Sequence, residues 1–130
     1  MRIEEPISSL MSAPVWSVGM DDSVAAIELL MTDKDLSWVP VVGPDGTAVG
    51  VVTRSDLLQF HHRGQDAAAV AAWLVCSYKP IGVDAATSIA RVAQLMLERK
   101  AHHVVVTQRD SMVGVVSALD FVRLAADARR

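Results

Sequence analysis

The motif that organises this chain reads Gly50-Val51-Val52-Thr53-Arg54-Ser55-Asp56 in its first copy and Gly114-Val115-Val116-Ser117-Ala118-Leu119-Asp120 in its second. The repetition extends outward from the motif, because an offset of 65 residues places Met11–Val41 over Cys76–Val106 with many matched apolar positions. Chance can supply single valine and alanine matches in so apolar a chain, but a whole ordered block is a stronger signal. The sequence therefore predicts two copies of one unit.

Each copy predicts the same order of elements, β-α-β-β-α. Asp22-Ser23 and Thr87-Ser88 are helix-starting pairs, because their side-chain oxygens can accept hydrogen bonds from free backbone N–H groups. Apolar residues at helical spacing follow each pair, and then come two β-branched runs separated by a turn. A closing helix follows each motif. The predicted strands lie at 15–18, 38–42 and 48–52 in the first copy and at 81–83, 103–107 and 112–116 in the second.

The copies divide the chain into predicted domains at 1–64 and 65–130. The join covers residues 61–70, where a run of alanines predicts that a helix restarts before Trp73. A chain of 130 residues fits one compact domain or two very small ones. Each half is too small to form a stable hydrophobic core alone, so the copies are expected to share a core.

Composition narrows the possible classes of protein. Hydrophobic residues make up 52% of the chain and charged residues 21%, which excludes global disorder. The net charge of −3 argues against a nucleic-acid partner, and the absence of an apolar run of about 18 uncharged residues argues against a membrane span. The acidic start does not resemble a signal peptide, and Cys76, the single cysteine, cannot form an internal disulfide. These features favour a cytoplasmic location.

The motif admits two interpretations. Thr53 and Ser117 fall where a strand ends and a helix begins, so each hydroxyl can cap a helix together with Asp56 or Asp120 three residues later. That role needs no ligand. In the functional interpretation the hydroxyl and the helix start bind a phosphate, and the aspartate accepts hydrogen bonds from the hydroxyls of a ribose. The residues alone leave both interpretations open.

The order of these motifs resembles the CBS (cystathionine-β-synthase-type) domain, and two in tandem resemble the CBS pair, or Bateman module, over residues 7–124. The resemblance implies an α/β (α+β) fold of two β-α-β-β-α repeats related by a pseudo-twofold axis, and a non-enzymatic, stand-alone module. It implies an adenosine-containing ligand of the AMP, ADP, ATP, S-adenosylmethionine or NAD class as a regulatory ligand rather than a cofactor. Asp56 and Asp120 would hold the ribose, and Thr53 and Ser117 the phosphate.

The same resemblance places the base in an apolar cleft between the repeats. It pairs the motif of one copy with the lead-in segment of the other, so that Ser117 would face Met11–Trp16 and Thr53 would face Cys76–Ile81. The second copy has Val105 where the first has Pro40, so the two clefts should differ and one or both could bind. The remaining residues expected to line the clefts are Met11, Trp16, Val18, Pro40, Cys76, Ile81, Val83 and His102.

The histidine pairs and the apolar helix faces bear on metal binding and on association. His61-His62 and His102-His103 are not expected to bind a metal, because adjacent side chains on a strand point to opposite faces and no further ligand accompanies them. The family resemblance implies instead that His102 or Lys100 could meet phosphate, since the family often carries a basic residue just before this strand. The apolar residues on the helices predict a partner surface made of helices, and the resemblance implies a homodimer with helices at its interface, against a monomer that uses these faces internally. A regulated protein partner is possible, but the sequence does not identify it. Two alternative functions remain, a ligand-independent scaffold module and a small enzyme that uses Cys76.

Overall fold

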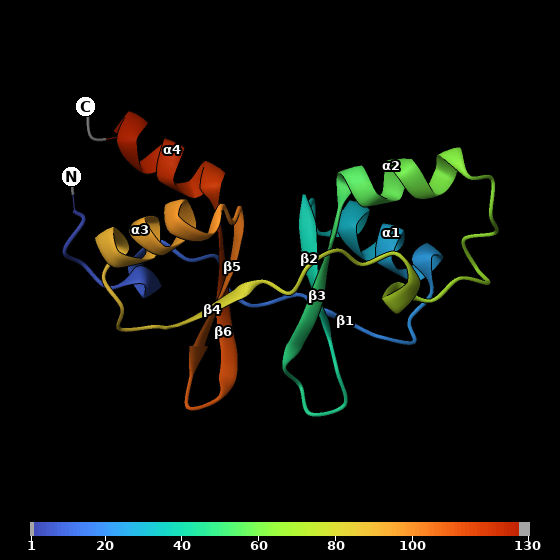
Figure 1. Cartoon of the computed structure of the whole chain (residues 1–130), viewed down its shortest axis with the longest axis horizontal. Coiled ribbons are helices and arrows are strands. Elements are labelled where there is room, and N and C mark those ends of the chain that lie inside the picture. The colour runs from blue at the N-terminus through green and yellow to red at the C-terminus, as the bar shows by residue number, and fades with distance from the viewer. Residues whose placement is uncertain (1, 128–130) are drawn as a thin grey trace. The chain divides into compact units, whose positions relative to one another are not determined.

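The structure is a computed structural model that describes residues 2–127, and it consists of two compact units (Figure 1). The central unit runs from Trp16 to Pro80. The terminal unit combines the residues up to Val15 with those from Ile81 onward. Because the chain leaves the terminal unit and later returns to it, the central unit is inserted within the terminal one. The predicted domain boundaries at 1–64 and 65–130 stay a prediction. The two units are defined by packing in space and not by the sequence repeat.

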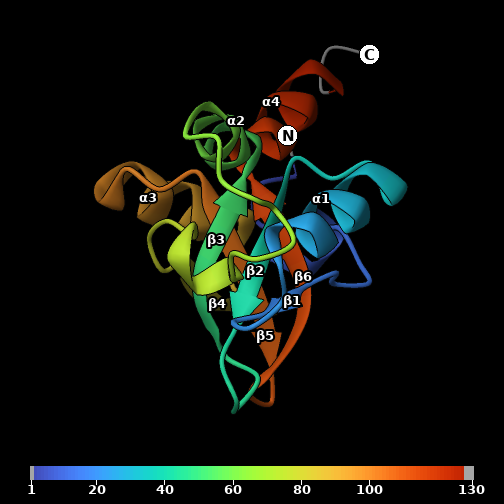
Figure 2. The same ribbon diagram turned by 90° about the vertical axis from the view of Figure 1, so that its right-hand side faces the viewer.

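The central unit contains one three-stranded sheet with two helices on one side of it (Figures 1 and 2). Strand β1 pairs in parallel with β2, and β2 pairs antiparallel with β3. Fully buried Ile27, Val39, Val41 and Val52 form the centre of its core. The elements are β1 (Val18–Gly19), α1 (Val24–Asp33), β2 (Trp38–Val42), β3 (Ala48–Thr53), α2 (Arg54–His62) and the 3-10 helix η2 (Ala72–Leu74).

The terminal unit repeats this arrangement. Its sheet has the order β4-β5-β6, again with one parallel and one antiparallel pair. Val92, Val104, Val106 and Val116 are fully buried in its core, together with Ile7 from the start of the chain. The elements are the 3-10 helix η1 (Ile7–Ser9), β4 (Ile81–Asp84), α3 (Ile89–Arg99), β5 (His103–Gln108), β6 (Ser111–Ser117) and α4 (Ala118–Asp127). The mixed α/β fold and the β-α-β-β-α order are thus confirmed.

The predicted helix starts are also confirmed. The Ser23 hydroxyl accepts a hydrogen bond from Ala26 N at 3.1 Å, and the Ser88 hydroxyl accepts one from Arg91 N at 3.1 Å. Each bond satisfies one of the backbone N–H groups that a helix leaves free at its first turn. The sequence signal at α1 and α3 is therefore a local one that the folded chain uses directly.

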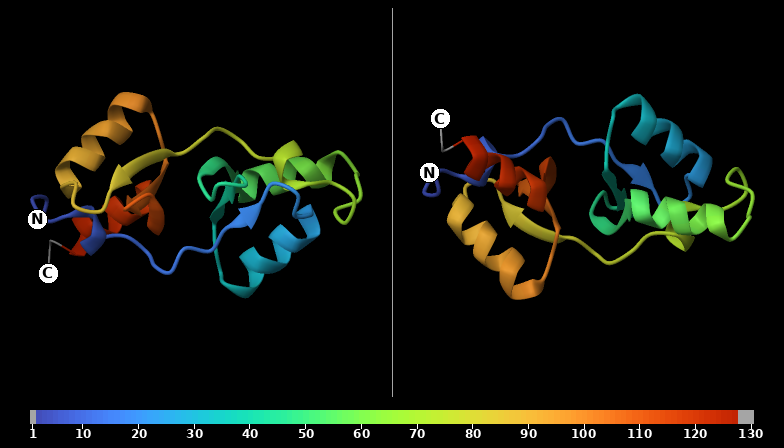
Figure 3. Two further views of the ribbon diagram at one scale, coloured as in Figure 1. Left: turned by 90° about the horizontal axis from the view of Figure 1, so that it is seen from below. Right: turned by 90° about the horizontal axis from the view of Figure 1, so that it is seen from above.

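Each unit is completed by a segment that leads into the other one (Figure 3). In the terminal unit, Ile7 N donates to Thr87 O at 2.6 Å and Ser12 N donates to Val115 O at 2.9 Å. In the central unit, Ser77 N donates to Val51 O at 2.7 Å, which fastens the outgoing segment to β3. The connecting segments thus supply hydrogen bonds to the strands that carry the motifs.

The helix expected before Trp73 is not present, and this prediction was wrong. Residues 67–69 form a turn in its place, followed by the short η2. The reason lies in α1, because Val70 O and Ala67 O accept hydrogen bonds from Val24 N and Ala25 N at 2.9 Å each. These carbonyls satisfy the free N–H groups of another helix and are not available to a helix of their own.

Candidate functional site

The first motif forms a closed capping box at the start of α2. Asp56 Oδ2 accepts hydrogen bonds from Thr53 N at 2.9 Å and from Thr53 Oγ1 at 3.0 Å. Thr53 Oγ1 in turn accepts a hydrogen bond from Asp56 N at 3.2 Å. The junction between β3 and α2 therefore fixes a hydroxyl and a carboxylate side by side at a helix N-terminus, where anions are favoured.

A third residue completes this site, and sequence reasoning did not single it out. The Ser77 hydroxyl donates to Asp56 Oδ1 at 2.6 Å, from a segment 21 residues away in sequence. The signal that could have found it is the repeat itself, since Ser12 and Ser77 stand at equivalent positions. The structure confirms that the segment beginning at Cys76 faces the first motif.

The second motif has a similar but looser geometry at the start of α4. Asp120 Oδ2 accepts a hydrogen bond from Ser117 N at 2.8 Å, whereas Ser117 Oγ lies 3.4 Å from the same oxygen. Asp120 Oδ1 faces the Arg123 guanidinium at 3.4 Å, and that arginine is 67% exposed. This site therefore pairs a half-buried carboxylate with a cation that reaches toward solvent.

The remaining predicted site residues divide between the two units. Met11 lies with Ser117 in the terminal unit, where its side chain fills the space above Gly114. Trp16 lies in the central unit, and Lys34 Nζ sits 4.4 Å from the centre of its ring. Of that pair, Trp16 is 40% exposed. Met11 packs on Gly114 and Ser12 pairs with Val115, both on the strand that ends at Ser117, while the prediction that Ser117 itself faces Met11–Trp16 stays a prediction.

Residues expected to line the base clefts lie mostly within the sheets. Val18, Pro40 and Val83 are buried, and Ile81 is half-buried and pairs in register with Val104. His102 is exposed, and its carbonyl accepts a hydrogen bond from Ala118 N at 3.0 Å. His102 therefore stands at the N-terminus of α4, next to the second motif. The role of all these residues in ligand binding stays a prediction.

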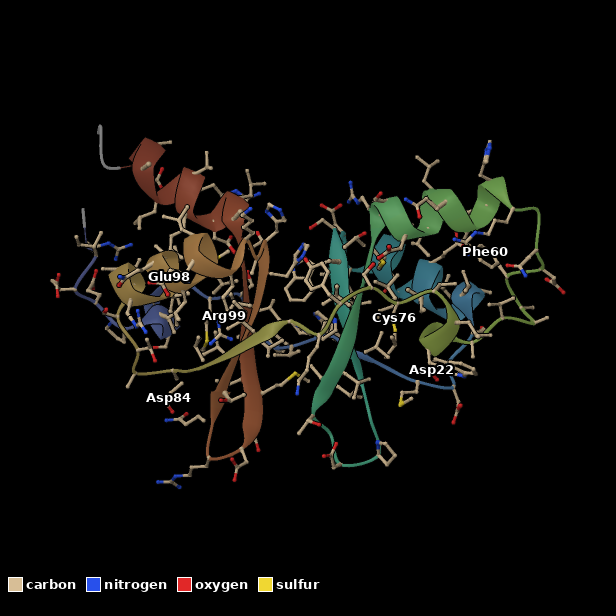
Figure 4. The ribbon with its side chains drawn as sticks, viewed as in Figure 1. Asp22, Phe60, Cys76, Asp84, Glu98 and Arg99 are labelled. Carbon is tan, nitrogen blue, oxygen red and sulfur yellow. The ribbon has the colours of Figure 1, made fainter. Side chains whose placement is uncertain are left out.

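Cys76 packs against β3, where Gly50 leaves room for it (Figure 4). Burial raises the pKa of the Cys76 thiol, and the negative charge of Asp56 raises it further. Burial likewise raises the pKa of Tyr78, with a smaller contribution from Asp56. A raised thiol pKa opposes the formation of thiolate, so the environment of Cys76 disfavours a nucleophile.

Two further properties of the described residues bear on function. Residues 2–127 contain no cluster of three or more histidine, cysteine or acidic side chains that could hold a metal ion. None of the helices in that range is both long enough and apolar enough to cross a membrane.

Comparison with known proteins gives two matches to one family description. The family model described as "CBS domain" matches residues 7–63 and again residues 73–127. Among solved structures, the CBS domain of a membrane protein from Sphaerobacter thermophilus superposes with a TM-score of 0.81 at 23% identity, covering 95% of this chain and 89% of that one. A Hypoxic Response Protein I with two coordinated zinc ions gives a TM-score of 0.75 at 25% identity, covering 91% and 97%.

A longer relative is also found. An uncharacterized protein from Methanocaldococcus jannaschii is 25% identical over 137 aligned residues, which cover 95% of this chain. The chain spans only 32% of the length of that relative.

Proposed function

Because this chain belongs to the CBS domain family, whose tandem pairs are generally regulatory or ligand-binding modules, we propose that it is a sensor for an adenosine-containing ligand. The ligand classes are AMP, ADP, ATP, S-adenosylmethionine and NAD. One observation carries the proposal: a hydroxyl and a carboxylate three residues apart stand twice at the start of a helix, as Thr53 with Asp56 and Ser117 with Asp120.

The chemistry of the two motifs suits this ligand class. A carboxylate can accept hydrogen bonds from both hydroxyls of a ribose, which Asp56 or Asp120 would provide. A helix N-terminus and a nearby hydroxyl favour phosphate, which Thr53 or Ser117 would contact. Proteins of this family are typically regulatory rather than catalytic, so the proposed output is a change of conformation and not a reaction.

The proposed mechanism is a shift between conformations that are already accessible. A ligand that binds one conformation more tightly favours that conformation in proportion to the difference in affinity. A ligand with equal affinity for both would change nothing, however tightly it binds. The population shift would then alter the affinity for a regulated protein.

Calorimetric titration of the chain with AMP, ADP, ATP, S-adenosylmethionine and NAD tests the proposal. We expect at least one of them to bind, and the double variant Asp56→Ala/Asp120→Ala to lose that binding. The variant Asp110→Ala provides a control, because this aspartate lies in the turn between β5 and β6, at the end of β6 opposite the second motif. Equal binding by the double variant and the wild type would reject the assignment.

The alternative function is a ligand-independent interaction module, and the exposed apolar residues on the helices favour it. Leu29 on α1 is 73% exposed, Leu58 on α2 is 74% exposed and Leu97 on α3 is 80% exposed. Leu97 also lines an apolar groove of about 480 Å³ between α3 and α4, together with Met96 and Phe121. This alternative predicts no nucleotide-dependent thermal shift.

Under either function we propose that a second copy of this chain covers these helices. Burial of apolar surface drives such association, at about 25 cal/mol per Å². Sedimentation velocity of the wild type should show a dimer, and Leu97→Arg should shift it toward monomer. Leu74→Arg is the matched control, since Leu74 is exposed but lies on η2, outside the four α-helices. A monomeric wild type would contradict the proposal.

A further inference from the structure

The two motif carboxylates are held differently, although they occupy equivalent positions in the repeats. In the central unit both oxygens of Asp56 are engaged, Oδ2 by Thr53 and Oδ1 by the Ser77 hydroxyl at 2.6 Å. In the terminal unit, Ser117 engages Asp120 Oδ2, and within residues 2–127 Oδ1 faces only Arg123 at 3.4 Å. Asp56 Oδ1 is thus held by a short bond from a half-buried serine, whereas Asp120 Oδ1 is held by a longer contact with an arginine that is 67% exposed.

The two sites differ in a side-chain hydrogen bond and not in their backbone hydrogen bonds. Ser12 and Ser77 are equivalent residues, and the backbone N–H of each donates to the strand before a motif, to Val115 O and Val51 O respectively. Ser77 is half-buried with its hydroxyl bonded to Asp56. Ser12 is exposed, and its hydroxyl makes no hydrogen bond to any residue within 2–127. The same residue type is thus a donor to the carboxylate in one unit only.

The close fit of the connecting segment explains why Ser77 reaches Asp56. A Cβ atom on Gly50 would lie 2.9 Å from both Cys76 Sγ and Ser77 O, so only a glycine lets the segment approach β3 this closely. Cys76, labelled in Figure 4, therefore rests on the strand, and the next residue is presented to the start of α2. The Ser77 hydroxyl is consequently placed by packing and backbone hydrogen bonding together.

The bond from Ser77 is of the kind that a ribose hydroxyl would form. A hydrogen bond from a hydroxyl to a charged carboxylate is roughly twice as strong as one between neutral groups. A ligand that enters at Asp56 must first displace this bond, and the freed Ser77 hydroxyl must then be solvated. A ligand that enters at Asp120 meets, among residues 2–127, no serine hydroxyl on Oδ1, and it displaces only the 3.4 Å contact with Arg123, whose side chain is 67% exposed.

On the basis of the proposed function, we propose that the wild-type chain takes its adenosine ligand at Asp120, while Ser77 holds the Asp56 site closed. Ser77 is then a specificity-determining residue that makes two repeated motifs unequal. Removal of its hydroxyl would open a second site at Asp56. The difference in affinity between the closed and the open site should be about tenfold or more, as expected for a charge-assisted hydrogen bond.

Equilibrium dialysis of the full chain against AMP, ATP and S-adenosylmethionine, in separate experiments, measures the number of sites and their affinities. We expect one tight site in the wild type, a strong loss of that site in Asp120→Asn, and a second tight site in Ser77→Ala. Ser77→Thr keeps a hydroxyl and should retain a single site. Ser111→Ala is the matched control, because Ser111 is an exposed serine at the start of β6, at the end of the strand opposite the second motif. Thermal unfolding establishes that each variant is folded.

The outcomes separate this inference from the function on which it rests. Tight binding that survives Asp120→Asn and is lost in Asp56→Asn would overturn the inference and leave the proposed function intact. A second site that is equally weak in the wild type and in Ser77→Ala would also overturn it. Failure of every variant to bind any of the three probes would reject the proposed function, and this inference with it.

Discussion

Gly50 and Gly114 are the residues at which the connecting segments touch the strands that carry the motifs. A Cβ atom on Gly114 would overlap the Met11 side chain, and one on Gly50 would overlap Cys76 and the Ser77 carbonyl oxygen. The glycine of each motif is therefore needed for close approach, while the hydroxyl and the carboxylate three and six residues later form the site. The roles of all three residue types are explained by the same junction.

Gly50→Ala tests this close approach. We expect the free energy of unfolding to fall by about 1–3 kcal/mol, because the backbone carbonyl of Ser77 cannot move aside without disturbing the connecting segment. Urea denaturation measures the change. Gly82→Ala is the control, because its Cβ would lie 3.8 Å from Val105 Cγ2, an ordinary contact, and should change stability by less than about 0.5 kcal/mol. Equal effects in both variants would contradict the account.

The thiol of Cys76 gives a pH-dependent prediction. Its pKa is raised above the ordinary 9.0, chiefly by burial, so the protonated form is favoured in the folded chain. The associated stabilisation is fully present below pH 9.0 and is lost as the pH rises through the folded pKa. Alkylation by iodoacetamide at pH 8 should be slower in the native chain than in urea, and its native pH midpoint should lie above 9.0. A lower native midpoint would support the rival enzyme reading of Cys76.

At the scale of elements, the helix starts could be predicted because their determinants are local. Ser23 and Ser88 cap α1 and α3 through the residue three positions later, so a short window contains all that is needed. The segment at 66–70 could not be predicted in this way. Its carbonyls are used by the first turn of α1, more than 40 residues earlier in the sequence, and alanine propensity does not report such a partner.

The serine caps can be tested as a pair. Ser23→Ala and Ser88→Ala should each lower the free energy of unfolding by about 1 kcal/mol, since each leaves one backbone N–H group without its partner. Asparagine at the same positions keeps an acceptor oxygen and should restore most of the stability. Urea denaturation of the four variants measures this. Asparagine variants as unstable as the alanine variants would show that the hydroxyl acts in some other way.

At the scale of the whole chain, the terminal unit is assembled from two separate stretches of sequence, because residues up to Val15 join those from Ile81 onward. The sequence repeat predicted two equivalent motifs, and the family resemblance implied the pairing of each motif with the lead-in segment of the other copy. It did not reveal that Ser77 reaches Asp56 while Ser12 leaves Asp120 alone. That difference depends on side-chain placement within each unit. Both repeat copies carry a serine at this position, so the sequence alone does not distinguish the two sites.

Ile7→Ala tests whether the opening segment belongs to the core of the terminal unit. Ile7 is fully buried in the core of the terminal unit although it precedes the whole central unit in sequence, so its truncation should cost about 2–5 kcal/mol. Ile3→Ala is the control, because Ile3 is 41% exposed and should cost well under half as much. Hydrogen exchange should then accelerate at amides of β4, β5 and β6, Val115 among them, and much less at those of β1, β2 and β3. Acceleration confined to the central unit would show that the opening segment does not belong to the terminal core.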